Sequence, residues 1–282
     1  MVRTAVHVLL IAGICVGLLG DSAAQEAGRT LLATVVDAGG RPMVDFSADD
    51  FVISEGSQSR DVLDVHIADY PVAVLVDDTA DPATWALLKG AVTRFIIRIG
   101  ERPVAVALLS DPDHVVASLD DDRATLLARI NALSPAPAAQ IATLPVVARV
   151  SQLLKATESP FSAVVIVATH AVDATEMVRG SLLPVILDSG AAVHVVEGRS
   201  ASVEQIPVAT SDLLRVLAEQ THGQYTTIFA QSSYAIALDR LADRLSSEMM
   251  VQYLVPPGER AGDVRVGVRR PGARVRGLGV SK

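Results

Sequence analysis

The feature that most constrains the fold is a repeated alternation that begins at Pro71. Short, continuous apolar runs are followed by stretches of helical pattern, several of ten or more residues. The expected strands cover residues 72–76, 104–109, 163–168, 192–196 and 225–227. This alternation predicts an α/β fold with a doubly wound, mostly parallel sheet flanked by helices. Half of the residues are apolar but only 4% are aromatic, which suits strands covered by helices on both faces.

The two ends of the chain have a different pattern, with short β-branched runs and turns. We therefore divide the chain into residues 25–69, an N-terminal β segment, residues 70–248, the α/β domain, and residues 249–282, a C-terminal β segment. Residues 37–81 contain eleven carboxylates against two arginines, whereas residues 260–282 contain seven cations against one carboxylate. Because the charges are opposed, we expect the two β segments to pack together as a small β module.

Residues 1–24 have the pattern of a signal peptide. Arg3 is followed by an apolar run and then by Ser22-Ala23-Ala24, so cleavage is expected before Gln25. The alternative is a retained membrane anchor, but the run is shorter than the ~20 residues of a spanning helix. We expect an exported protein, periplasmic or secreted, with no stable membrane span after cleavage. Its only cysteine, Cys15, lies in the removed segment, so the mature chain forms no disulfide.

The loop directly after the first predicted strand is the expected functional site. Ligands of open α/β sheets bind beyond the carboxyl ends of the strands, and this loop reads Asp77-Asp78-Thr79-Ala80-Asp81. Strand, Asp-x-Thr-x-Asp, then helix resembles the Asp-x-Ser-x-Ser motif of the von Willebrand factor type A fold. Residues 39–65, 213–228, 241–258 and 264–277 are similar, in the same order, to segments of bacterial VWFA-related domain proteins of the acidobacterial type. The resemblance covers nearly the whole mature chain.

The resemblance implies a metal-ion-dependent adhesion site in which Asp77, Thr79, Asp81 and Thr143 hold Mg²⁺ or Ca²⁺. The sequence departs from that pattern at two positions. Asp81 replaces a neutral serine, and its alternative role is to cap the following helix. His170 stands where the family has an aspartate, and hard Mg²⁺ disfavours imidazole. We therefore expect a degenerate site that binds a metal ion weakly or not at all, and we predict no other cofactor.

The same resemblance also implies a function. It implies a protein-binding, adhesion-type module that is not an enzyme and docks a partner through the rim of the sheet, with Asp78, His170 and Asp173 on that rim. The alternative is a metal-dependent hydrolase that uses the same carboxylates. The net charge of −8 argues against nucleic acid as a partner. His194, inside an apolar run, is expected to be a core residue. The sequence indicates no particular oligomeric state.

Overall fold

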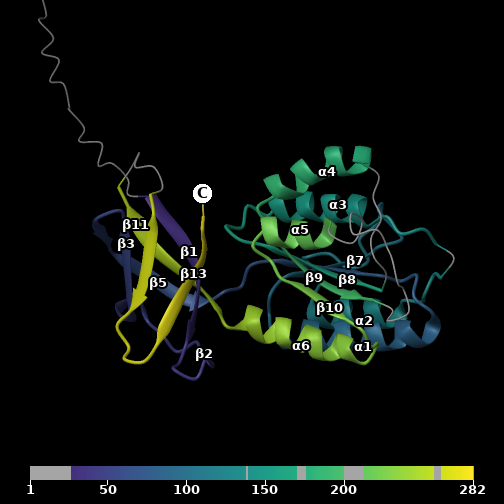
Figure 1. Cartoon of the computed structure of the whole chain (residues 1–282), viewed down its shortest axis with the longest axis horizontal. Coiled ribbons are helices and arrows are strands. Elements are labelled where there is room, and N and C mark those ends of the chain that lie inside the picture. Colours follow the sequence, from purple (N-terminus) through teal and green to yellow (C-terminus); the bar gives the residue numbers. More distant parts are fainter. Residues whose placement is uncertain (1–26, 138, 170–175, 200–212, 257–261, 282) are drawn as a thin grey trace, which may run out of the picture.

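The computed structural model describes residues 27–137, 139–169, 176–199, 213–256 and 262–281. These residues form an α/β lobe and a β module that lie side by side (Figure 1). The α/β lobe contains one five-stranded parallel sheet in the order β10-β9-β8-β6-β7. Its strands are β6 (Val72–Val76), β7 (Val104–Leu108), β8 (Ala163–Ala168), β9 (Ala192–Gly198) and β10 (Tyr225–Ile228).

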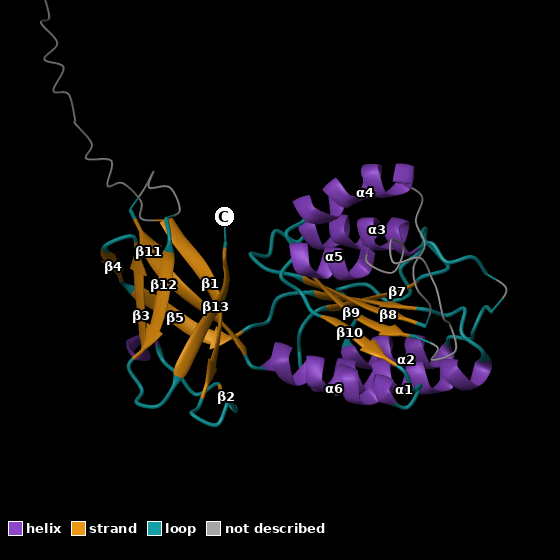
Figure 2. Ribbon diagram, viewed as in Figure 1, coloured by secondary structure: helices purple, strands orange, loops and turns teal. Residues whose placement is uncertain are grey.

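Helices cover both faces of this sheet (Figure 2). One face carries α1 (Pro82–Arg98), α2 (Arg123–Ala132) and α6 (Ser233–Ser246), and the other carries α3 (Thr143–Lys155), α4 (Glu176–Asp188) and α5 (Leu213–Gln220). Side chains of β6 alternate between two apolar cores, with Val74 in one and Leu75 in the other. The predicted mostly parallel, helix-flanked sheet is confirmed for this lobe. The β module, by contrast, is antiparallel.

The β module is built from both ends of the chain. One sheet has the order β13-β1-β11-β5, with β2 paired to β1, and the other has the order β12-β3-β4. Strands β1 and β3 pair antiparallel with C-terminal strands, β1 with β11 and β13, and β3 with β12. The elements are β1 (Ala27–Val36), β2 (Pro42–Met43), the 3₁₀ turn η1 (Ala48–Asp50), β3 (Phe51–Glu55), β4 (Gln58–Arg60), β5 (Val62–Ile67), β11 (Glu248–Val255), β12 (Val264–Val268) and β13 (Arg274–Val280).

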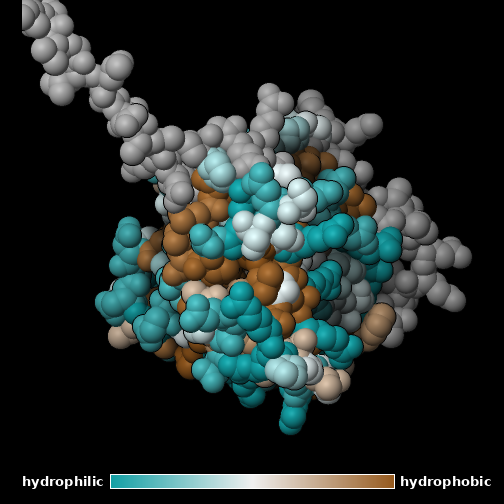
Figure 3. Space-filling view, turned by 90° about the vertical axis from the view of Figure 1, so that its left-hand side faces the viewer, coloured by the Kyte–Doolittle hydropathy of each residue, from teal (hydrophilic) through white to brown (hydrophobic). Residues whose placement is uncertain are grey.

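Backbone pairing and apolar packing, rather than charge, hold the two ends together. Leu31, Ile53 and Val251 belong to one buried cluster that both sheets share. Among the described residues, the only ion pair between segments 37–81 and 260–282 joins Arg270 to Asp50 at 3.8 Å, and both side chains are partly exposed. A pair near the surface contributes roughly 0–1 kcal/mol. The opposed charges are therefore a minor part of the pairing. Seen end-on, the module shows hydrophobic residues among hydrophilic ones (Figure 3).

Two connections join the module to the α/β lobe, between β5 and β6 and between α6 and β11. They are tied together by a hydrogen bond from the N–H of Ala68 to the carbonyl of Glu248, 2.8 Å. Within the described part of the chain, no helix has the length and apolar character needed to cross a bilayer.

Candidate functional site

The order of the parallel strands places the candidate site between β6 and β8. The chain runs from β6 outward to β7 and then returns past β6 to β8, so these two strands flank the point where the winding reverses. Ligands of open α/β sheets bind at such a point. Asp77 directly follows β6 and Thr169 directly follows β8. The N–H of Asp77 donates to the carbonyl of Val167 (2.9 Å), which fixes the two strand ends against each other.

Asp77 is the centre of a hydrogen-bond network. Its side chain is buried, with 0% of the residue exposed. Oδ1 accepts hydrogen bonds from the backbone N–H (3.0 Å) and the hydroxyl (2.6 Å) of Thr79. Oδ2 accepts from the backbone N–H of Thr169 (2.9 Å) and from the Thr169 hydroxyl. Each carboxylate oxygen thus has two donors from the protein itself.

These hydrogen bonds keep the buried carboxylate charged. Burial alone raises the pKa of Asp77, but the hydrogen bonds from Thr169 and Thr79 outweigh it, so the pKa lies below its ordinary value. An ionised carboxylate only accepts hydrogen bonds. Each of the two threonine hydroxyls therefore donates its single hydrogen to Asp77. On its other side the Thr79 hydroxyl presents oxygen lone pairs.

Asp81 is turned away from this network. Its Oδ1 accepts from the N–H groups of Ala83 (3.0 Å) and Thr84 (3.1 Å), and its Oδ2 accepts from the Thr84 hydroxyl (2.5 Å). Asp81 is the N-cap of α1, with Pro82 at the first helical position. In the structure Asp81 therefore caps α1, which is the alternative role considered for it from the sequence. The pKa of this exposed carboxyl is lowered, chiefly by the Thr84 hydroxyl.

Asp78 does not lie on an exposed rim, and that prediction is wrong. Only 1% of the residue is exposed. Its carboxylate accepts from the N–H (3.2 Å) and the hydroxyl (2.6 Å) of Ser110, which follows β7. Its backbone carbonyl accepts from the N–H of Ala136 (2.7 Å). Asp78 thus links the end of β6 to the end of β7. The side chains of adjacent loop residues point to opposite sides, and that of Asp77 points towards the end of β8.

The remaining predicted residues are only partly accounted for. Thr143 is the first residue of α3 and is buried, and its Oγ1 has no hydrogen-bond partner in the described part of the chain. It is not among the residues that line the pocket beside Asp77. His170 and Asp173 lie outside the described residues. Of the four predicted metal ligands, hydrogen bonds join only Asp77 and Thr79 directly.

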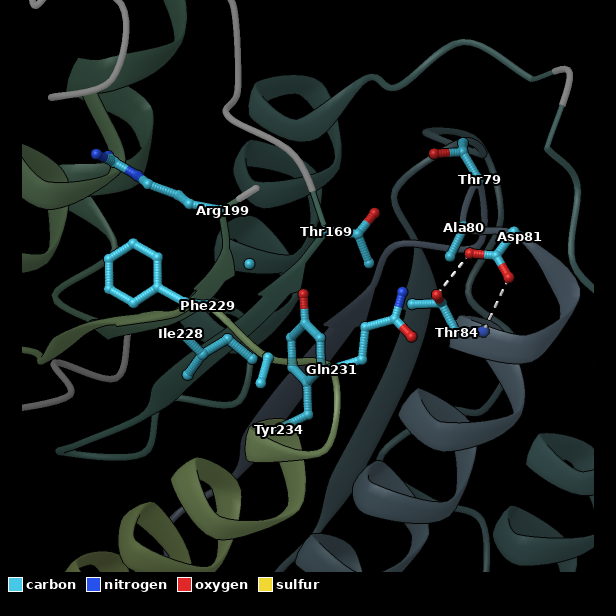
Figure 4. A pocket seen from close by; sticks show the side chains of 12 residues that line it. Thr79, Ala80, Asp81, Thr84, Thr169, Arg199, Ile228, Phe229, Gln231 and Tyr234 are labelled. Atoms are coloured by element: carbon cyan, nitrogen blue, oxygen red, sulfur yellow. Dashed lines mark hydrogen bonds between the residues drawn. The ribbon is translucent and has the colours of Figure 1, made fainter. Parts of the chain in front are cut away.

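A pocket of about 420 Å³ opens beside this network, at the carboxyl ends of β6, β8, β9 and β10 (Figure 4). Thr79 and Asp81 line one side, and Tyr234 points up between them and Phe229. The hydroxyl of Tyr234 donates to the carbonyl of Ala168 at 2.8 Å. Phe229 is 71% exposed, an unusual position for an aromatic ring. The other lining residues are Ala80, Thr84, Thr169, Gly198, Arg199, Ile228, Ala230 and Gln231.

One wall of the pocket carries a second polar group that sequence reasoning missed. Arg199 donates from Nη2 to the Tyr225 hydroxyl (2.9 Å), and its Nε lies 3.6 Å from Oε1 of the buried Glu197. The Tyr225 hydroxyl in turn donates to Glu197. Burial raises the pKa of Tyr225, and this hydrogen bond adds to the effect. Arg199 is thus held against a buried carboxylate at the end of β9.

The residues at this site do not fit the metal that the resemblance implies. Mg²⁺ requires about six oxygen ligands in a near-octahedral array. Both oxygens of Asp77 are filled by four protein donors, and Asp81 caps α1. Among the described residues, no group of three or more His, Cys, Asp or Glu side chains is arranged to hold an ion. The arrangement satisfies Asp77 by hydrogen bonds instead.

Comparisons with known proteins find solved structures at low sequence identity and with TM-scores below 0.5. Neither a protein-family model nor a curated protein sequence matches the chain. Among solved structures it is similar to the conserved hypothetical protein BatB from Bacteroides thetaiotaomicron, with 8% identity over 62% of this chain and 98% of that one, TM-score 0.42. It is also similar to an aerotolerance-related membrane protein from Bacteroides fragilis, with 11% identity over 62% and 99% of the two chains, TM-score 0.43. The human COPII-coat protein Sec24c shares 10% identity over 76% of this chain and 44% of that one, TM-score 0.46.

Proposed function

We propose that this chain is an exported binding module with a doubly wound, von Willebrand factor type A-like lobe that docks a partner protein at the carboxyl ends of its parallel strands. In this proposal the signal peptide in residues 1–24 is cleaved, the adhesion site is degenerate, and docking needs no metal ion. The module is not an enzyme. The observation that carries the proposal is the direction of the hydrogen bonds around Asp77.

The polar floor of the pocket accepts hydrogen bonds rather than donating them. The hydroxyls of Thr79 and Thr169 both donate inward to Asp77, and the hydroxyl of Tyr234 donates to a carbonyl. The oxygen of the Thr79 hydroxyl therefore offers lone pairs to a group that enters the pocket. A buried charged carboxylate lies directly behind the two threonine hydroxyls. A group with several N–H donors and a positive charge complements this floor.

The wall of the pocket suits the stem of a lysine or arginine side chain. Ile228 and the exposed ring of Phe229 offer apolar surface to the methylene groups, and an aromatic face also attracts a cation. The one lining cation among the described residues, Arg199, is engaged by Glu197 and Tyr225. We therefore infer that the partner inserts a cationic side chain. A pocket of about 420 Å³ is far larger than a single metal ion requires.

The rival function, a metal-dependent hydrolase, finds less support in the same residues. Such an enzyme would use Asp77 and Asp81 as ligands or as a general base. Asp77 is saturated by four donors, and Asp81 accepts three hydrogen bonds within the first turn of α1. A base needs a free lone pair facing the substrate.

Capture from envelope extract with variants of the pocket tests the proposal. Immobilised wild-type protein should retain a specific partner equally in Mg²⁺ and in chelator. Phe229→Ala and Thr79→Val should reduce capture at least tenfold. Ile236→Ala, which truncates an exposed apolar residue of α6 outside the pocket, is the matched control and should leave capture unchanged. Capture that chelator abolishes, or that all three variants retain, would refute the proposal.

A further inference from the structure

A second pocket, of about 800 Å³, lies at the opposite end of the parallel sheet, between the α/β lobe and the β module. Strands β1 and β13 of the module face the lobe here (Figure 1). Leu32 and Leu278 line the pocket from the module, and Phe161 and His194 line it from the lobe. Glu248, at one of the two connections between the lobe and the module, also lines it, as do the charged residues Lys155, Glu158, Asp188 and Arg244. The volume lies within the range of small-molecule sites, roughly 300–1,000 Å³.

His194 contributes a fixed hydrogen-bond donor to this pocket. It is a core residue by burial, as expected, with 2% of its surface exposed, but it also lines the cavity. Its Nδ1 accepts from the backbone N–H of Gln224 at 3.1 Å, so this nitrogen carries no hydrogen. Burial, and secondarily Arg244, lowers the pKa of His194 to about 3. The neutral ring therefore carries its hydrogen on Nε2, for which no acceptor is found among the described residues.

Glu248 contributes a hydrogen-bond acceptor to the same pocket. It is 2% exposed, and the Tyr70 hydroxyl donates to Oε2. No described residue donates to Oε1. Burial raises the pKa of Glu248, and the Tyr70 hydrogen bond and the nearby Arg102 and Arg244 oppose that effect.

Arg244 gives the pocket a cation that is close to Glu248 without being paired to it. Its Nη1 donates to Oε1 of Gln224 at 3.1 Å, which leaves its other N–H groups available. No ion pair within 4.0 Å joins Arg244 to Glu248, although both line the same cavity and the arginine lowers the glutamate pKa. Two further charged lining residues, Lys155 and Asp188, are paired with each other at 2.5 Å, whereas Arg244 and Glu248 do not meet. Two opposite charges that line one cavity without meeting call for a ligand with both charges.

We propose that this pocket binds a small zwitterion of the free α-amino acid class with an apolar side chain. The ammonium group of the ligand donates to Oε1 of Glu248. Its carboxylate accepts from Arg244 and from Nε2–H of His194. Its side chain packs against Leu32, Phe161 and Leu278. The bound ligand contacts both the β module and the α/β lobe, so it stabilises their association.

Single-charge analogues of leucine test this assignment on the full-length protein. L-Leucine should raise the Tm and bind in titration calorimetry. 3-Methylbutylamine lacks the carboxylate and 4-methylpentanoate lacks the ammonium group, so each should bind at least tenfold more weakly, a difference of about 1.4 kcal/mol. Failure of L-leucine and L-phenylalanine to bind at millimolar concentration, or equal binding of leucine and the two analogues, would overturn the proposal.

Three variants test whether L-leucine binds in this pocket. Glu248→Gln should weaken L-leucine at least tenfold but leave 4-methylpentanoate unchanged, and Arg244→Gln should weaken L-leucine without affecting 3-methylbutylamine. Arg240→Gln, at an exposed position of the same helix outside the pocket, should change nothing. Leucine binding that neither pocket variant reduces would place the ligand elsewhere. Because Arg244 is only half-buried, its variant remains informative should Glu248→Gln impair folding.

Discussion

The backbone N–H and the hydroxyl of Thr169 both donate to Oδ2 of Asp77, and these hydrogen bonds join the carboxyl ends of β8 and β6. Thr79 occupies Oδ1 in the same way from within the β6–α1 loop. A carboxylate that the family resemblance assigns to a metal ion is thus fully hydrogen-bonded by the chain. This arrangement makes Asp77 a buried anion that is hydrogen-bonded to two threonines lining the pocket.

Replacing Thr169 by valine should destabilise the protein. The variant keeps the shape of the side chain and the backbone hydrogen bond but removes the hydroxyl donor to a charged, buried carboxylate. A hydrogen bond of this kind contributes about 1.5–3 kcal/mol. Urea unfolding of wild type, Thr169→Val and the control Thr93→Val, at a half-buried position of α1, measures the effect. A loss of unfolding free energy smaller than that of the control variant would mean that water replaces the Thr169 hydroxyl.

The stabilising effect of Asp77 should depend on pH. Because the pKa of Asp77 is lower in the folded chain, its contribution is present above the unfolded pKa of about 3.9 and is lost as the pH falls through the folded pKa. Asp77→Asn should therefore cost on the order of 3 kcal/mol at pH 7. The difference between the two proteins should shrink in unfolding experiments below about pH 4. A difference that stays constant down to pH 2 would contradict a charged Asp77.

The role of Asp81 as a helix cap can be separated from a role as a metal ligand. Serine caps a helix about as well as aspartate, whereas alanine does not cap. Asp81→Ala should lower the Tm, and Asp81→Ser should restore it, with the same values in Mg²⁺ and in chelator. A Tm that rises with Mg²⁺ in the wild type but not in Asp81→Ala would show instead that this carboxylate binds the ion.

Gly198 and Tyr234 should be energetically coupled. A Cβ atom at position 198 would collide with the hydroxyl oxygen of Tyr234. Gly198→Ala should therefore cost about 1–3 kcal/mol of unfolding free energy. Tyr234→Phe removes the hydroxyl, so the double variant should be more stable than the sum of the two single effects predicts. Additive effects in this double-mutant cycle would show that the loop shifts to admit the methyl group.

Much of the fold follows from local pattern. The strands at 72–76 and 163–168 have the predicted bounds, because fully buried strands leave clear signals. Strands β2 and β4 were not predicted. They have two and three residues, and their pairing depends on neighbours distant in sequence. The sequence also overstated the role of charge in the β module, since a count of charges does not show whether opposite charges meet.

The site was harder to predict than the fold. The motif pointed to Asp77 and Thr79, which the structure joins by hydrogen bonds. The search for a carboxylate ligand after β8 led to His170, and Thr169 was overlooked. A threonine directly after a buried strand was the available signal, because its backbone N–H and hydroxyl both lie at the strand end. Arg199, Phe229 and Tyr234 come from elements that only the tertiary structure brings to this edge of the sheet.

The most direct test of a metal-independent, cation-accepting pocket is an NMR titration of protein with labelled threonine methyl groups and phenylalanine rings. Nα-Acetyl-L-lysine amide, the neutral Nα-acetyl-L-norleucine amide, which lacks the ammonium group, and MgCl₂ are added in separate experiments. We expect the lysine derivative to shift the resonances of Thr79, Thr169 and Phe229, while norleucine amide and Mg²⁺ leave them unchanged. Shifts of Thr79 and Thr169 with Mg²⁺ but not with the lysine derivative would contradict this account and restore the metal site.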